Sequence, residues 1–180
     1  HYTRLTGTSA AAPHAAGAAA LLLEQRPGLS PEELKAALVS TASPHPDLTV
    51  YHQGSGRLDV ARALTQTVTA APAVLNLGSF DYPQEEGVLA QGTVIYRNRG
   101  DADVTLSLTL GLSDDIGRAL PAEHVRLSHD AVTVPAGGEA AVTVTVDIGA
   151  VDPGVYGGWL AARDGEGRTV LHTPVGFYAG

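Results

Sequence analysis

The residues best suited by type and spacing to take part in a reaction lie near the start of the chain, in the run Gly7-Thr8-Ser9. Small residues follow, and the pattern predicts a helix from about Thr8 to Gln25. A serine in the first turn of a helix lies beside backbone N–H groups that lack a partner within the helix, at the positive end of its dipole. Negative charge forming on a substrate oxygen is stabilised there. Taken alone, however, these three residues favour a plain helix cap.

The residues around and after Ser9 form a longer pattern. The blocks are LTGTSAAAPHAAGAAALL at 5–22, LSPEELK at 29–35, LVSTA at 38–42 and QGSGRLDV at 53–60. In this order they resemble the nucleophile segment of the subtilisin-like serine peptidases (subtilases) and the blocks that follow it to the end of their catalytic domain. The resemblance covers about the first 65 residues.

The resemblance implies a role for each residue near the helix start. Ser9 would be the nucleophile, its own backbone N–H would form part of the oxyanion hole, and Thr8 would assist on that side. Gly7 would let a peptide substrate approach the backbone. In subtilases the triad order is Asp, His, Ser, so both partners of the serine, and the oxyanion-hole Asn, are expected upstream of His1. A chain with a nucleophile but no base is expected to be inactive alone.

Two alternatives for the serine chemistry fail on geometry and sequence. His14 lies five residues after Ser9, which on a helix means about 140° of rotation and roughly 7.5 Å of rise, so its ring cannot reach the serine. We expect His14 to be a structural, hydrogen-bonded residue. The nucleophile elbow of α/β-hydrolases is excluded because Ser9 is not flanked by the Gly-x-Ser-x-Gly pattern.

Composition narrows the possible partners. The chain has 180 residues, a net charge of −8, a single lysine and no cysteine, which excludes disulfides and thiolate metal sites and argues against nucleic-acid binding. The longest apolar run, Ala15 to Leu23, is too short to span a bilayer. The chain contains no methionine, and we expect that its true start, with part of the catalytic domain, is missing.

The first half of the chain, residues 1–68, contains residues typical of the starts and ends of helices. Ser30 with Glu33 predicts a capping box at the start of a second helix, and Asp59 predicts the cap of a short last helix. Around Val50 and Tyr51 we expect a short extended piece. The first helix is small and apolar on all sides, which is typical of a helix buried inside a larger domain.

The second half, residues 69–180, alternates apolar and polar residues in short runs, which predicts strands. We expect the linker at Gln66–Pro72. The predicted strands are 73–77, 88–97, 104–110, 124–127, 142–148, 155–162 and 169–178. The fold class is therefore multidomain: the C-terminal helical part of an α/β subtilisin-like catalytic domain, then an all-β antiparallel sandwich of the fibronectin or immunoglobulin type. This half also resembles, by pattern, the fibronectin type III-like domain that follows the catalytic domain in larger secreted subtilases.

Weaker signals lie in the second half. Arg99-Gly100-Asp101 matches an adhesion tripeptide but also suits an ordinary hairpin turn. The acidic pairs at 114–115 and 164–166 could hold calcium, although solvated turns are the simpler interpretation. Trp159 is most simply a core anchor of the sandwich, and if exposed it could bind carbohydrate or peptide.

We therefore predict a segment of a secreted or cell-surface serine endopeptidase that acts on proteins or peptides, with Ser9 catalytic and Gly7 and Thr8 on the oxyanion and substrate side. We expect no cofactor or metal in this chain and no nucleic-acid partner; calcium is possible in the missing part of the parent enzyme. The alternative is a non-enzymatic β-sandwich module for binding or adhesion, in a pseudoprotease or a cell-surface protein.

Overall fold

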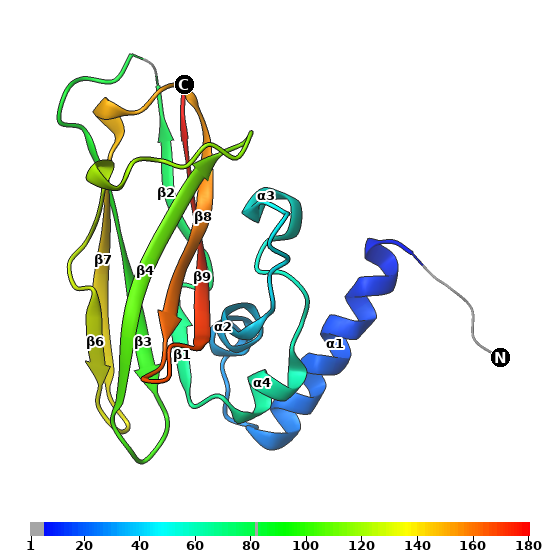
Figure 1. Ribbon diagram of the computed structural model, residues 1–180. Helices are drawn as coiled ribbons and strands as arrows, with labels where there is room; N and C mark the ends of the chain where they lie inside the picture. Colours follow the sequence, from blue (N-terminus) through cyan, green and yellow to red (C-terminus); the bar gives the residue numbers. More distant parts are fainter. Residues whose placement is uncertain (1–5, 82) are drawn as a thin grey trace.

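The computed structural model describes residues 6–81 and 83–180, which form a helical unit (residues 6–66) and a β-sandwich packed side by side (Figure 1). The helices are α1 (Thr8–Gln25), α2 (Pro31–Thr41), α3 (Val50–Gln53) and α4 (Val60–Thr65). The strands are β1 (Val68–Ala71), β2 (Leu75–Phe80), β3 (Leu89–Asn98), β4 (Val104–Asp114), β5 (Val125–Leu127), β6 (Ala131–Val134), β7 (Glu139–Asp147), β8 (Gly154–Arg163) and β9 (Thr169–Ala179). Two short 3₁₀ turns, η1 (Ala122–His124) and η2 (Ile148–Ala150), precede β5 and follow β7.

The predicted helix boundaries are confirmed. Helix α1 spans Thr8–Gln25, and α2 begins with the expected capping box: the Glu33 N–H donates to Ser30 Oγ (3.2 Å), while the Ser30 N–H donates to Glu33 Oε2 (2.9 Å). Asp59 caps α4 by accepting from the Arg62 N–H at 3.0 Å. These ends are correct because capping depends on residues that are adjacent in the chain.

The extended piece expected at Val50 and Tyr51 is wrong. These residues form the single helical turn α3, which ends at Gly54 with a φ of 61°. A turn this short is not stable by itself. Its side chains pack instead on the sandwich, where Gly157 leaves room for Val50 and Tyr51.

The sandwich consists of two sheets that share one core. One sheet has the order β1-β3-β7-β5 and the other the order β2-β9-β8-β4-β6. Fully buried side chains from both sheets, such as Val94 and Val144 from the first and Leu106 and Leu160 from the second, belong to one hydrophobic cluster. The alternation seen in the sequence therefore does mark the inward face of each strand.

The expectation of a wholly antiparallel sandwich is wrong, since β2 pairs with β9 in parallel. The linker expected at Gln66–Pro72 is also wrong in part, because Val68–Ala71 is strand β1, paired with β3. Val68 and Ala70 point into the core. Both β1 and the unpredicted β6 have only four residues, too few for alternation to distinguish them from a connection.

The helical unit contacts the sandwich through α2 and α3. Helix α2 lies over β1 and β9, and α3 lies against β8. Glu33 of α2 pairs with Arg97 (2.8 Å) and with Arg99 of the sandwich. The Tyr51 hydroxyl donates to the Tyr156 carbonyl at 2.6 Å. These contacts fix the two parts of the chain against each other.

Helix α1 lies on the far side of the helical unit from the sandwich (Figure 1). It contacts α2 and α4, and within the described residues only Ala18 and Leu22 of this helix are buried. Leu21 is 49% exposed and Leu23 is 38% exposed. The contacts within this chain therefore leave most of the helix uncovered, and the expectation that it is buried inside a larger domain stays a prediction. Among the described helices, none has the length and apolar character that crossing a membrane requires.

Candidate functional site

The structure places Ser9 in the first turn of α1, where its side chain is exposed. The first backbone hydrogen bonds of the helix run from the N–H groups of Ala10 (3.0 Å) and Ala11 (3.2 Å) to the Gly7 carbonyl. The N–H groups of Thr8 and Ser9 precede these bonds and point out of the helix end. A serine hydroxyl and N–H donors thus lie together at the positive end of an 18-residue helix.

Gly7 gives this helix start its shape. Its φ of 141° and ψ of 159° lie in a region that side chains with a Cβ rarely adopt, and no heavy atom lies within 4 Å of the position that a Cβ would occupy. Glycine is needed here for backbone conformation, because there is no steric crowding to avoid. The chain can therefore enter the helix at Thr8 in a conformation that other residues rarely adopt, and the space beside Gly7 is open.

His14 is engaged with its own helix. Its Nδ1 lies 2.8 Å from the Ala10 carbonyl oxygen, so Nδ1 carries the proton and donates it. This confirms the expected hydrogen bond, although the residue is exposed. This hydrogen bond holds the imidazole ring against its own helix, and the argument against His14 as the base for Ser9 remains the rotation and rise between positions 9 and 14.

An apolar groove of about 510 Å³ lies beside α1. It is lined by Ala15 of α1, by Leu34 and Leu38 of α2 and by the loop from Gly54 to Leu58. Ala15 is the residue of α1 that lines this groove, whose lining is mainly apolar but includes Lys35 and Ser55. Apolar surface of this kind is a candidate interaction site.

The two acidic turns considered for calcium use their carboxylates internally. Asp114 Oδ1 accepts the N–H groups of Ile116 (3.1 Å) and Arg118 (2.7 Å), and its Oδ2 accepts from the Arg118 side chain at 2.6 Å. Asp164 does the same with Glu166 and Arg168. In both turns burial raises the aspartate pKa, but the hydrogen bonds from arginine and backbone outweigh it and hold the pKa below its ordinary value.

Both turns are therefore closed loops built on the pattern Asp-x-x-Gly-Arg, in which the glycine has a positive φ, 87° at Gly117 and 77° at Gly167. The sequence left calcium open but favoured solvated turns, and in the structure the Asp114 and Asp164 oxygens accept hydrogen bonds from arginine and backbone donors of their own turns. Across residues 6–81 and 83–180, no three His, Asp or Glu side chains gather in a way that could hold a metal ion.

The remaining weak candidates also lose their functional interpretation. The Arg99 side chain pairs with Glu33 of α2, so the adhesion tripeptide does not present its arginine freely. Trp159 is half-buried and lies on the outer face of its sheet, since the adjacent Leu160 points into the core. The expectation of a core anchor is wrong, because strand alternation fixes the face and Leu160 already occupies the inner one.

Sequence reasoning missed the buried residue His172. Its Nε2–H donates to the Ser55 carbonyl at 3.0 Å, across the boundary between the sandwich and the helical unit. Burial lowers its pKa, although the Ser55 hydrogen bond opposes this. Its alternation with the inward-facing Leu171 and Thr173 places it on the outer face. Only the docking of the helical unit then makes that face a buried one.

Comparison with known proteins defines the class of the helical unit. Residues 1–73 match the Subtilase family. Subtilisin DY of Bacillus licheniformis is 47% identical over 62 residues, which are 34% of this chain and 22% of that protein. This part of the chain is therefore a subtilisin-like segment, and its match includes the candidate residues Gly7, Thr8 and Ser9.

Similarity extends into the sandwich in two further relatives. The minor extracellular protease Vpr of Bacillus subtilis is 29% identical over 187 residues, covering 96% of this chain and 21% of that protein. The solved structure of tripeptidyl peptidase 2 superposes on 94% of this chain and 16% of its own, with a TM-score of 0.51 and 20% identity, which shows likeness of fold. The chain spans about a fifth of the length of the curated relatives Vpr and subtilisin DY.

Proposed function

We propose that the chain is the nucleophile-bearing segment of an extracellular subtilisin-like serine endopeptidase, with Ser9 as the nucleophile. The observation that carries this proposal is the position of Ser9: it is exposed at an uncapped helix start, beside Gly7 in a conformation suited to close approach. The match of residues 1–73 to the Subtilase family supports the same reaction. The subtilisin-like segment would belong to the α/β catalytic domain of the parent enzyme.

In the proposed reaction the Ser9 oxygen attacks the carbonyl carbon of a peptide bond. Its proton passes to a histidine base from another part of the catalytic domain, which then protonates the departing amine as the C–N bond breaks. The Ser9 N–H, with Thr8 on the same side, donates to the oxyanion of the tetrahedral intermediate. Water then attacks the acyl-enzyme with the help of the same base and releases the second product. In this scheme Ser9 is the nucleophile and an oxyanion donor, Thr8 assists on the oxyanion side, and Gly7 lets the substrate approach the backbone.

The apolar surface around α1 fits a role as an interface within the parent enzyme. Helix α1 carries no charged residue from Thr8 to Leu23, and the groove beside it is lined mainly by apolar side chains. We assign the remainder of the catalytic domain to this surface. Because the base would come with that remainder, the 180-residue chain alone would be inactive.

The sandwich would brace this segment. Its contacts with α2, α3 and the Gly54–Leu58 loop hold the elements on which α1 rests. The alternative, a non-enzymatic binding or adhesion module, would be favoured by an exposed Trp159 and an exposed turn at residues 98–101 in a parent that lacks the upstream Asp and His. Since Arg99 is paired with Glu33 and Trp159 is half-buried, we favour the peptidase.

The proposal can be tested with a fluorophosphonate probe, which labels activated serines. The parent polypeptide, including the sequence upstream of His1, should be labelled, and Ser9→Ala should abolish both labelling and peptide hydrolysis. Ser107→Ala, which alters an exposed serine on β4, is the matched control and should have no effect. Undiminished labelling of Ser9→Ala, or rapid labelling of the isolated chain, would contradict the proposal.

A further inference from the structure

The proposed chemistry leaves one buried titratable side chain without a role, His172 of β9. It is 2% exposed, and among the described histidines it alone is buried. Its Nε2–H donates to the Ser55 carbonyl at 3.0 Å. Because Ser55 belongs to the helical unit and β9 to the sandwich, this hydrogen bond joins the two parts of the molecule. The boundary thus encloses an imidazole, the side chain whose charge changes in mild acid.

The loop that His172 contacts, Gly54–Leu58, is a firmly held part of the helical unit. Ser43 and Arg57 exchange two backbone hydrogen bonds, of 2.7 and 2.9 Å. Between Ser55 and Arg57, Gly56 has a φ of 101°, and a Cβ at this position would collide with the Ser43 carbonyl. Ser43 lies two residues after the end of α2. His172 therefore holds both the loop and this end of α2 on the sandwich.

The elements packed against β9 offer no acidic partner for a protonated His172. Strands β1, β2 and β8 contain neither Asp nor Glu. Helix α2 has its two acidic residues in the first turn, where Glu33 is already paired with Arg97 and Arg99. Its buried residues are all uncharged: Ala36, Ala37, Ser40 and Thr41.

The charge nearest in effect to His172 is a cation. Arg62 of α4 acts on the imidazole through its field. Asp59 lies 3.9 Å from the Arg62 side chain, but it also serves as the N-cap of α4. In the loop itself, Arg57 is a second cation, and it is exposed. A second proton on His172 would therefore place a positive charge in a buried position beside Arg62.

Protonation should accordingly weaken the contact. Burial lowers the pKa of His172 below its ordinary value of 6.5, and Arg62 acts in the same direction, although the Ser55 hydrogen bond opposes both. A histidine released from the boundary would take up its proton more readily than the docked one. Docking is therefore fully stable above about pH 6.5 and weakens as the pH falls from there toward the lowered pKa.

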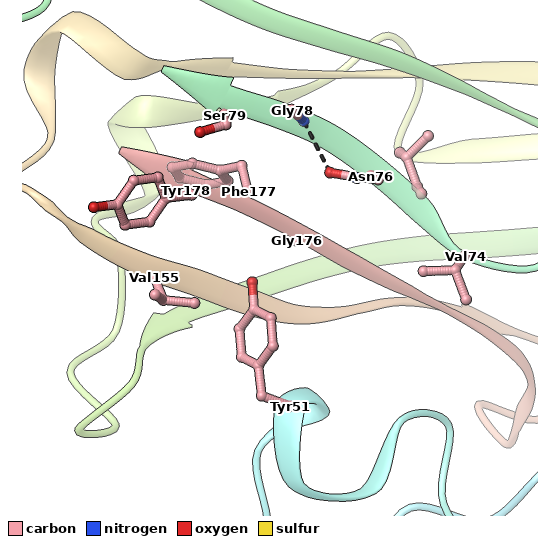
Figure 2. Close-up of a pocket in the computed structure, with 10 residues that line it drawn as sticks. Tyr51, Val74, Asn76, Gly78, Ser79, Val155, Gly176, Phe177 and Tyr178 are labelled. Carbon is pink, nitrogen blue, oxygen red and sulfur yellow. Dashed lines mark hydrogen bonds between the residues drawn. The ribbon is translucent and has the colours of Figure 1, made fainter. Parts of the chain in front are cut away.

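Two other contacts across the boundary do not change in this pH range. Figure 2 shows Tyr51 extending from α3 toward the strand that carries Gly176, and its hydroxyl donates to the Tyr156 carbonyl. Burial raises the pKa of Tyr51, so the hydroxyl keeps its proton. Glu33, with a pKa of about 2, stays ionised and paired. Mild acid therefore acts on the His172 contact and leaves α3 and the first turn of α2 attached.

We propose that His172 is a pH-sensitive contact, which holds the Gly54–Leu58 loop on the sandwich when neutral and releases it in mild acid. The loop lines the groove beside α1, to which we assign the remainder of the catalytic domain. In the parent enzyme the sandwich would thus support the catalytic segment best at neutral and alkaline pH. This consequence rests on the proposed function, whereas the pH dependence of the contact does not.

The contact is tested on the 180-residue chain by NMR. Ring ¹⁵N shifts should show His172 titrating at a lower pH in the folded chain than in urea. Protection of the Gly56 and Arg57 amides, corrected for intrinsic exchange, should fall severalfold between about pH 7.5 and about pH 5.5, since each pH unit between the two pKa values changes the docking equilibrium about tenfold.

Matched variants separate titration from packing. His172→Gln keeps a donor near the Nε2 position and cannot titrate, so protection of the loop should not depend on pH. His52→Gln, at an exposed histidine of α3, is the control and should behave like the unaltered chain. Arg62→Gln removes the neighbouring cation and should reduce the pH dependence, which provides a test that does not require His172→Gln to fold.

Three results would overturn the proposal: titration of His172 at the same pH in the folded and urea-unfolded chains, loop protection that does not change with pH, or unaltered pH dependence in His172→Gln. In the parent enzyme, the activity of His172→Gln relative to the unaltered enzyme should rise severalfold from about pH 8 to about pH 6. This ratio cancels the titration of the catalytic base, which both enzymes share. A constant ratio would exclude regulation by the contact, whereas absence of hydrolysis by both enzymes would instead contradict the proposed function.

Discussion

The sandwich and the helical unit bury their apolar residues in very different ways. The sandwich closes a continuous core between two sheets, in which Leu160 and Val144 are fully buried. In the helical unit the described residues form only a small cluster around Leu22, Ala37 and Ala63. The sandwich therefore carries its own stability, whereas the helical unit depends on what it contacts.

The part of the molecule that provides most of the stability is therefore not the part that carries the candidate reactive residue Ser9. Loops and exposed helix ends that carry reactive groups are often less stable than the scaffold that positions them. Here Ser9 lies at the N-terminal end of α1, most of whose residues are exposed. Helix α2 lies between α1 and the sandwich, which is the scaffold. Helices α2 and α3 connect the two regions, so substitutions in each layer should have distinct consequences.

The largest effect is expected when the two cores are compared directly. Leu160→Ala removes a fully buried side chain from the sandwich and should lower its free energy of unfolding by about 2 to 5 kcal/mol. Leu22→Ala, equally buried in the helical unit, should instead release α1 and leave the sandwich intact. Hydrogen exchange at β7 and α1 during urea unfolding measures both. Equal loss of protection at β7 in the two variants would show that the two regions form one cooperative unit.

An intermediate effect is expected at the contact between α3 and the sandwich. A Cβ on Gly157 would lie 2.4 Å from Val50 Cγ1 and 2.7 Å from Tyr51 Cε2. Gly157→Ala should therefore displace α3 at a cost of about 1 to 3 kcal/mol, seen as faster hydrogen exchange at Gly54. Gly111→Ala on the neighbouring strand has open space around its Cβ and serves as control. Unaltered exchange at Gly54 in Gly157→Ala would show that α3 does not depend on this contact.

The smallest effect is expected from the ion pairs at the start of α2. The hydrogen bond from the Ser30 N–H, together with Arg99 and Arg97, lowers the pKa of Glu33 from 4.5 to about 2. A lowered carboxyl pKa stabilises the fold above the unfolded-state value, so this contribution should persist at pH 5 and disappear as the pH falls from about 4.5 to 2.

Glu33→Gln should accordingly cost about 1 kcal/mol at pH 7, because both arginines are partly exposed, and much less at pH 2, where about half of the Glu33 carboxyl groups are protonated. The measurement is the free energy of unfolding by urea at each pH. Glu139→Gln, which removes only an exposed partner of Arg97, should have a smaller effect. An equal cost of Glu33→Gln at pH 2 and pH 7 would assign its role to packing.

The sequence predicted most of the elements, because the signals that mark them are local. Ser30, Glu33 and Asp59 cap helices through neighbours three residues away, and alternation in the long strands identified their inward faces. The same logic failed for short elements. Strand β1, strand β6 and the turn α3 are each four residues long, and tertiary contacts stabilise them.

The candidate site divides in the same way. The resemblance to subtilases singled out Ser9, Gly7 and Thr8, and the helix pattern placed the serine at a helix start. The exclusion of His14 followed from helix geometry, since rotation and rise depend only on residue number. Sequence could not show that the carboxylate oxygens of Asp114 and Asp164 are hydrogen-bonded within their own turns, because the arginine and backbone donors reach them only through the folded turn.

The sequence by itself thus determined the helix that carries Ser9 and the face of each long strand, since both depend on residues close together in the chain. Only the tertiary structure decided which other parts of the chain pack against those faces. Docking of the helical unit buried His172, paired Arg99 with Glu33 and joined the Tyr51 hydroxyl to the Tyr156 carbonyl. The residues in such contacts can lie more than a hundred positions apart, as Tyr51 and Tyr156 do. No local pattern encodes such contacts, because they arise only when two separately folded surfaces meet.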